Sequence, residues 1–192
     1  HEFYGFLHEG HYYAESGTVD HLRSNEPPYN DKNPLLRNRQ VIKEKAYYTH
    51  ALARAAVAFI HRNRKKPFFL YVPFNSVHSP MQATHKDITR FAHIADPHRR
   101  VFAAMLASLD DAVGAILQKL RKESLLGQTL IVFLSDNGGP VAELTSSNAP
   151  LRGQKGQLYE GGIRIPFMMQ FPGRIPPGQS SSAPVSSLDL VP

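Results

Sequence analysis

The ten residues Leu130–Gly139, LIVFLSDNGG, decide how we interpret the rest of the chain. Five apolar residues run without interruption, which is the pattern of a strand buried on both faces of a parallel sheet. After Ser135 comes the polar pair Asp136 and Asn137, and two glycines complete the stretch. In open α/β sheets, ligands gather beyond the carboxyl ends of the strands. We therefore expect a ligand-binding loop at the end of a buried strand.

The bulk composition is that of a globular protein. The chain has 192 residues, 42% of them hydrophobic, which is enough to bury a sizeable core. It contains no cysteine, and this excludes disulfides, thiolate metal sites and a cysteine nucleophile within these residues. No run of 18 apolar residues occurs, so we expect no membrane span. The net charge of +6 would suit an anionic partner, but the basic residues are spread over many segments, which favours an ordinary solvated surface.

Alternating helix and strand patterns indicate the fold class. Apolar residues recur at helical spacing over about residues 41–63 and again over residues 97–122. Short apolar runs at residues 68–72, 130–134 and 165–171 are typical of buried strands. Because helices and strands alternate without internal repeats, the chain is expected to form an α/β layer structure with a mostly parallel central sheet.

Three groups of polar residues are candidates for chemistry. Asp136 and Asn137 offer adjacent oxygen donors, which hard cations such as calcium or magnesium prefer, although a turn that merely ends the strand gives the same pattern. His78 follows another apolar run, in a loop that a parallel sheet would deliver to the same edge. Arg152 and Lys155 lie among glycines, which would let a ligand oxyanion approach the lysine; a solvated basic turn is the alternative.

Taken together, these motifs and their order resemble the sulfatase family, in particular arylsulfatases of the A/B and N-acetylgalactosamine-sulfatase type. The resemblance extends over nearly the whole chain. The matching stretches are FYGFL, PFFLYVPFNSVHSPMQA, SLDDAVGAILQKL, TLIVFLSDNGGP and NAPLRGQKGQLYEGGIRIPFMMQFPGRIPPG. The resemblance implies that the chain is part of a domain with an alkaline-phosphatase-like fold, a three-layer sandwich with a mostly parallel central sheet.

The resemblance also implies roles for particular residues. Asp136 and Asn137 would be ligands of a calcium ion, with magnesium as the alternative metal. His78 and Lys155 would be catalytic and substrate-binding residues that face the sulfate ester. Gln154 stands where a glycine is common in the family, which leaves Lys155 in register. The implied reaction is hydrolysis of a sulfate monoester by a formylglycine nucleophile.

One departure from the family pattern is large, because the chain has neither a cysteine nor a serine in the motif that matures to formylglycine. We therefore expect residues 1–192 to be an internal part of a sulfatase catalytic domain. The nucleophile region would lie upstream and a C-terminal subdomain downstream, and the chain alone would be inactive.

Two other functions fit parts of the sequence. A metal-dependent phosphoesterase of the alkaline phosphatase superfamily would use a similar strand end, but it often carries histidine where Asn137 stands, and imidazole suits zinc. A non-catalytic module that binds anionic glycans would need Arg152 and Lys155 but no cation. For the sulfatase, the expected partner is a sulfated small molecule or glycan, without nucleic acid. A periplasmic, extracellular or lysosomal location is implied by the resemblance alone, and the oligomeric state is left open.

Overall fold

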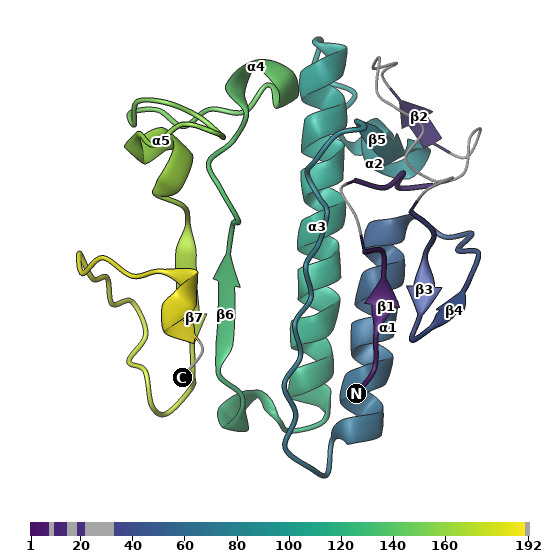
Figure 1. Cartoon of the computed structure of the whole chain (residues 1–192), viewed down its shortest axis with the longest axis vertical. Coiled ribbons are helices and arrows are strands. Elements are labelled where there is room, and N and C mark those ends of the chain that lie inside the picture. The colour runs from purple at the N-terminus through teal and green to yellow at the C-terminus, as the bar shows by residue number, and fades with distance from the viewer. Residues whose placement is uncertain (8–9, 15–18, 22–32, 191–192) are drawn as a thin grey trace.

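A computed structural model describes residues 1–7, 10–14, 19–21 and 33–190 of the chain (Figure 1). The helices are α1 (Tyr48–Asn63), α2 (His85–Arg90), α3 (Pro97–Lys122), α4 (Val141–Leu144) and α5 (Glu160–Ile163), with 3-10 turns at Leu126–Gln128 and Ser187–Leu190. The strands are β1 (Tyr4–Gly5), β2 (Val19–His21), β3 (Leu36–Arg37), β4 (Gln40–Val41), β5 (Gln82–Thr84), β6 (Ile131–Leu134) and β7 (Phe167–Gln170).

Helix α3 organises the domain, and its limits confirm the sequence prediction. The side chain of Asp96 accepts a hydrogen bond from the backbone nitrogen of Arg99 at 2.6 Å, and Pro97 opens the first turn, where its missing N–H is not needed. One face of α3 joins a buried cluster with β5 and the aromatic residues Tyr13 and Tyr47. In Figure 1, α1 lies along one side of α3 and the β6–β7 pair along the other.

Helix α3 is also the one described helix that is long and apolar enough to cross a membrane, judged by length and composition alone. In the structure it packs instead against α1, α2 and β5, and 39% of its most apolar window is buried.

Helix α1 is shorter than predicted, because it begins at Tyr48 and not near Val41. Residues 36–41 form the β3–β4 hairpin, whose turn contains Asn38 in the left-handed region at φ 56°. The Glu44 carboxylate then accepts a hydrogen bond from the backbone nitrogen of Ala46 at 2.9 Å, which fixes the chain just before the helix. The predicted end at Asn63 is correct.

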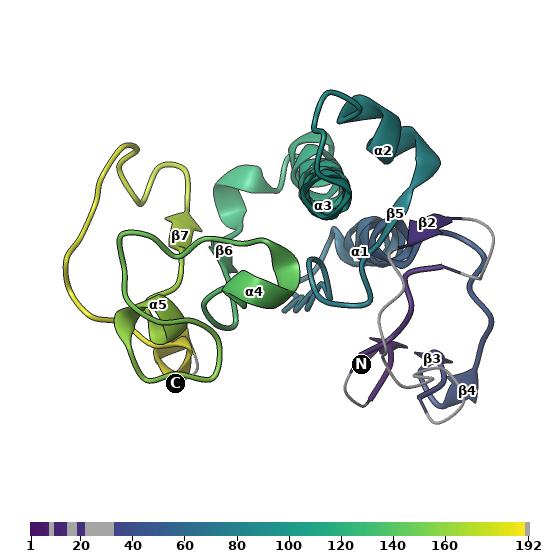
Figure 2. The ribbon, with the colours of Figure 1, turned by 90° about the horizontal axis from the view of Figure 1, so that it is seen from above.

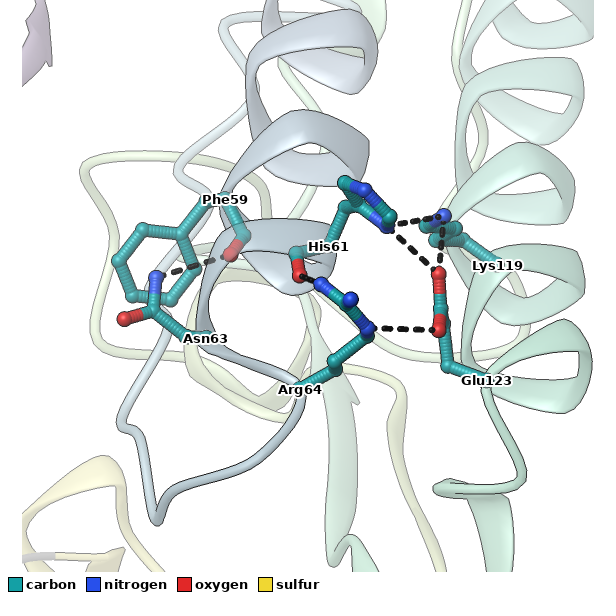
Figure 3. A network of polar contacts seen from close by, with 6 residues as sticks. All are labelled: Phe59, His61, Asn63, Arg64, Lys119 and Glu123. Atoms are coloured by element: carbon teal, nitrogen blue, oxygen red, sulfur yellow. Dashed lines mark hydrogen bonds and ion pairs between the residues drawn. The ribbon is translucent and has the colours of Figure 1, made fainter.

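The C-terminal ends of α1 and α3 are joined by charged side chains (Figure 3). The Glu123 carboxylate accepts hydrogen bonds from Lys119 Nζ at 2.5 Å and from His61 Nδ1 at 2.8 Å, and Arg64 Nε lies 3.6 Å from its second oxygen. The hydrogen bond from Lys119, followed by that from His61, lowers the pKa of the Glu123 carboxyl from 4.5 to about 2. The contact therefore links the two longest helices through one ionised carboxylate.

This contact has a predictable pH dependence. Because the folded pKa of Glu123 lies below its ordinary value, its stabilising effect is complete above about pH 4.5 and is lost as the pH falls towards about 2. An NMR titration of the Glu123 side-chain carbonyl carbon should therefore have its midpoint near the lower value. Lys119→Ala should move that midpoint upwards. A midpoint near 4.5 in the unmodified protein would show that the contact does not persist in solution.

The strands form small antiparallel sheets. In the described residues, β6 pairs with β7 in the register Ile131 to Gln170, and the other pairs, β1–β3, β3–β4 and β2–β5, are antiparallel as well. The predicted runs at residues 130–134 and 165–171 are thus confirmed as strands. The parallel pairing that the sequence led us to expect is not formed among the described strands.

The predicted strand at residues 68–72 was wrong. The segment is extended and runs in the same direction as β6 in Figure 1, but it is not paired with any described strand. A strand requires a hydrogen-bonded neighbour, and apolar composition alone does not supply one. Phe69 and Tyr71 are accordingly exposed, at 85% and 74%.

An apolar cavity of about 560 Å³ separates α3 from the β6–β7 sheet, and Leu106, Phe133 and Met168 are among the residues that line it.

Candidate active site

The loop after β6 is shaped by short side-chain hydrogen bonds. Asp136 Oδ1 accepts from the backbone nitrogen of Asn137 at 3.0 Å, and the Asn137 amide donates to the carbonyl of Gly138 at 3.0 Å. These are the contacts of a turn that ends a strand. They leave Asp136 Oδ2 and Asn137 Oδ1 without a hydrogen-bond donor among the described residues. Two adjacent oxygen donors of this kind fit a hard cation.

The same loop packs closely on α5, which requires glycines. The backbone nitrogen of Gly138 donates to the carbonyl of Gly162 at 2.9 Å. A Cβ on Gly138 would lie 1.8 Å from the carbonyl oxygen of Gly161, and a Cβ on Gly161 would lie 2.3 Å from the carbonyl oxygen of Gly153. Backbone therefore approaches backbone at both positions. Only glycine leaves room for the loop after β6 and the loop at residues 152–157 to meet on α5.

Asn148 joins these two loops, and the sequence interpretation missed it. Its Oδ1 accepts from the backbone nitrogen of Gly139 at 2.9 Å, and its Nδ2 donates to the carbonyls of Gly139 and Gly153 at 2.8 and 3.1 Å. One amide thus uses its donor and acceptor sides together. The signal in the sequence was an asparagine in a run rich in Ser, Asn and Pro, which is ordinary in any loop.

His78 and Lys155 are brought into direct contact although they are 77 positions apart. His78 Nδ1 lies 2.8 Å from the carbonyl oxygen of Ser79, and because a carbonyl only accepts, Nδ1 carries a proton and donates it. In the neutral ring, Nε2 then holds the lone pair. Lys155 Nζ lies 3.0 Å from Nε2 and donates to it. The backbone nitrogen of His78 donates to the hydroxyl of Tyr13 at 3.0 Å, which fixes the start of the loop.

Arg152 has a different arrangement from Lys155. Its guanidinium lies 3.9 Å from the ring centroid of Tyr159 and donates to the hydroxyl of that residue at 3.0 Å. The Arg152 carbonyl also accepts from the backbone nitrogen of Gly161 at 2.7 Å. Arg152 therefore stabilises the loop at residues 152–157, while Lys155 projects from it, exposed, towards His78.

The four predicted site residues lie on loops that are connected to one another by hydrogen bonds. His78 and Lys155 touch directly. Asp136 and Asn137 are connected to the Lys155 loop through Asn148 and through the packing on α5. Within the described part of the chain, no hydrogen bond or ion pair joins their side chains directly to His78 or Lys155. In the described ranges, no group of three or more His, Cys, Asp and Glu residues could hold a metal ion.

Known proteins match this chain over most of its length. A family model described as "Sulfatase" matches residues 2–192. Steryl-sulfatase of Rattus norvegicus is 35% identical over 157 residues, which cover 75% of this chain and 25% of that protein. A sulfatase of Formosa agariphila is 32% identical over 186 residues, which cover 87% of this chain and 32% of that protein.

A solved structure has the same arrangement of elements. The crystal structure of Ps i-CgsB in complex with k-i-k-neocarrahexaose superposes with a TM-score of 0.87 and 37% sequence identity, over 98% of this chain and 43% of that one. The predicted α/β fold class is thereby confirmed. The chain spans about a quarter of the length of rat steryl-sulfatase and less than half of the solved structure.

Proposed function

The chain belongs to the sulfatase family, and from this premise we propose that the full-length protein of which it forms part hydrolyses sulfate monoesters. The observation that carries the proposal is the 3.0 Å contact between Lys155 Nζ and His78 Nε2. Asn148 and α5 connect the loop of Lys155 to the loop of Asp136 and Asn137. The comparisons do not favour the phosphoesterase or the non-catalytic glycan-binding module.

The chemistry of the substrate explains why these groups suit it. A sulfate monoester is an anion, and negative charge develops on the leaving oxygen as the sulfur–oxygen bond breaks. The ammonium group of Lys155 would bind a sulfate oxygen and stabilise that charge electrostatically. His78 is oriented by the hydrogen bond from Nδ1 to Ser79, so Nε2 is the ring atom left to act on the substrate. Once Lys155 turns to the sulfate and the imidazole has taken up a proton at Nε2, that proton would pass to the leaving oxygen.

The metal and the nucleophile are part of the same proposal. Asp136 and Asn137 would hold a calcium ion through oxygen atoms, and residues outside this chain would complete its coordination. When bound, calcium would polarise a sulfate oxygen, and a formylglycine outside this chain would supply the nucleophile. We propose a sulfated glycan as the substrate. The likeness to Ps i-CgsB, a structure in complex with a neocarrahexaose, covers nearly the whole chain and supports this choice.

The function is tested by purifying the full-length protein and measuring its turnover. We expect release of sulfate from an aryl sulfate and from a sulfated oligosaccharide, with the oligosaccharide giving the higher kcat/KM. A phosphate monoester of the same aryl alcohol serves as the comparison. Faster turnover of the phosphate ester, with zinc bound in place of calcium, would contradict the proposal.

The metal assignment gives a prediction of its own. Asp136→Ala should weaken calcium binding by at least about 100-fold, since it removes a charged ligand and not merely an outer-sphere partner. Isothermal titration of the metal-free full-length protein measures this directly. Asp110→Ala is the matched control, because it removes an exposed carboxylate from α3, which carries none of the proposed metal ligands. Equal calcium affinity in both variants would show that Asp136 is not a ligand.

A further inference from the structure

Helix α4 contacts the loop that carries Lys155. The backbone nitrogen of Val141, the first residue of α4, donates to Gln154 Oε1 at 3.0 Å. The first N–H groups of a helix have no partner within it, so this side chain satisfies one of them. Gln154 immediately precedes Lys155, and its own backbone nitrogen is held by Gln157 Oε1 at 3.2 Å. The position of Gln154 therefore sets where the Lys155 side chain begins.

The same helix contacts the loop that carries His78. Glu143 Oε1 accepts from Ser79 Oγ at 2.7 Å. Ser79 is buried, and its carbonyl is the group that accepts from His78 Nδ1. Glu143 is thus connected to the imidazole through one residue, and the hydrogen bond is charge-assisted and hence stronger than a neutral one.

Helix α4 is itself fixed to α3, the longest element of the fold. Leu144 is 3% exposed and belongs to the same buried cluster as Met105 of α3. The carbonyl of Thr145 accepts from Arg99 Nη1 at 2.8 Å. Figures 1 and 2 place α4 between α5 and the N-terminal end of α3. A four-residue helix is therefore held rigidly enough to act as a support for both loops.

From these contacts we infer that Glu143 and Gln154 are positioning residues. They hold His78 and Lys155 at the distance at which both can bind one sulfate group, and the inference rests on the proposed function. Lys155 is an exposed, flexible side chain, and only a fixed loop can keep its ammonium group beside the imidazole. A glycine, which the family resemblance leads one to expect at position 154, has no side chain to accept from Val141. The contact is thus made by a residue that departs from the expected motif.

The test compares variants of the full-length protein. Glu143→Ala and Gln154→Ala should each lower kcat/KM for the sulfate ester by about 10-fold, since small displacements of reacting groups reduce rates by up to about 100-fold. Because both act through α4, the double variant should lose less than the product of the two single effects. Glu143→Gln keeps an acceptor for Ser79 and should restore most of the activity. Glu2→Ala and Gln118→Ala are the matched controls, because they change exposed residues before β1 and near the C-terminal end of α3.

A second measurement is independent of turnover. Lys155→Ala should change the ¹⁵N chemical shift of the His78 imidazole in the otherwise unmodified protein, and this change should become much smaller when Glu143 and Gln154 are both alanine. If the protein has no sulfatase activity, the proposed function fails, but this comparison still decides whether α4 holds the pair together. If Lys155→Ala changed the ¹⁵N chemical shift of His78 equally in the unmodified protein and in the double alanine variant, the inference would be overturned. A loss of activity that follows only the thermal midpoint and is not restored by Glu143→Gln would also overturn it.

Discussion

Lys155→Ala in the full-length protein is expected to lower kcat/KM for a sulfate ester by about 10² to 10³, the loss typical when one electrostatic stabiliser of a transition state is removed. Among the described residues, Lys155 Nζ is the only cationic group in hydrogen-bond contact with His78 Nε2, the ring nitrogen that faces away from Ser79. Steady-state kinetics with the aryl sulfate measure the effect.

Two further variants show whether charge or geometry matters at this position. Lys155→Arg keeps the charge but replaces a compact ammonium with a planar group, so it should recover only part of the loss. Lys66→Ala removes an exposed lysine from the loop after α1 and should leave the kinetics unchanged. If Lys155→Ala retained activity within about twofold of the unmodified protein, Lys155 would not stabilise the developing charge, since such a stabiliser is worth far more.

Gly138→Ala is expected to abolish measurable turnover and to destabilise the fold by about 1 to 3 kcal/mol, the usual range for overpacking. The new Cβ would lie 1.8 Å from the carbonyl oxygen of Gly161, and the neighbouring atoms are backbone, which cannot rotate away as a side chain could. The loop after β6 must therefore shift, and Asp136 and Asn137 shift with it. Activity assays and thermal unfolding of the same preparation measure the two effects.

Gly114→Ala is the matched control for that substitution. Gly114 lies within α3, and an added Cβ there meets nothing within 4 Å. Because alanine favours a helix over glycine by about 0.5 to 1 kcal/mol, this variant should be as stable as the unmodified protein or more so. A Gly138→Ala protein that unfolds at the same temperature as the Gly114→Ala protein and retains full activity would show that the loop and α5 are not packed as described.

The features that depend on local pattern were predictable from the sequence. Helix α3 was found with correct limits, since apolar spacing, an N-cap aspartate and a proline in the first turn all act within a few residues. Strands β6 and β7 were found because apolar runs bounded by turn residues leave few alternatives. The contact between His78 and Lys155 agrees with the family resemblance, although no periodicity could have indicated it.

The features that depend on distant neighbours were not predictable. Residues 68–72 have the composition of a strand, but no described strand pairs with them, and composition cannot reveal whether a partner is present. Asn148 and Glu143 look like ordinary polar loop residues. Their roles follow only from the fold, which brings Gly139 near Gly153 and places Ser79 beside α4.

The packing on α5 has a consequence for anyone who wishes to alter what this enzyme family accepts. The backbones of Gly138 and Gly153 both pack against the glycine pair of α5, Gly161 and Gly162. A displacement of one loop would therefore displace the other through these shared backbone contacts. Most substitutions of these glycines would therefore yield inactive protein. Libraries that instead vary outward-facing positions such as Leu158, which is 91% exposed, would leave these backbone contacts intact.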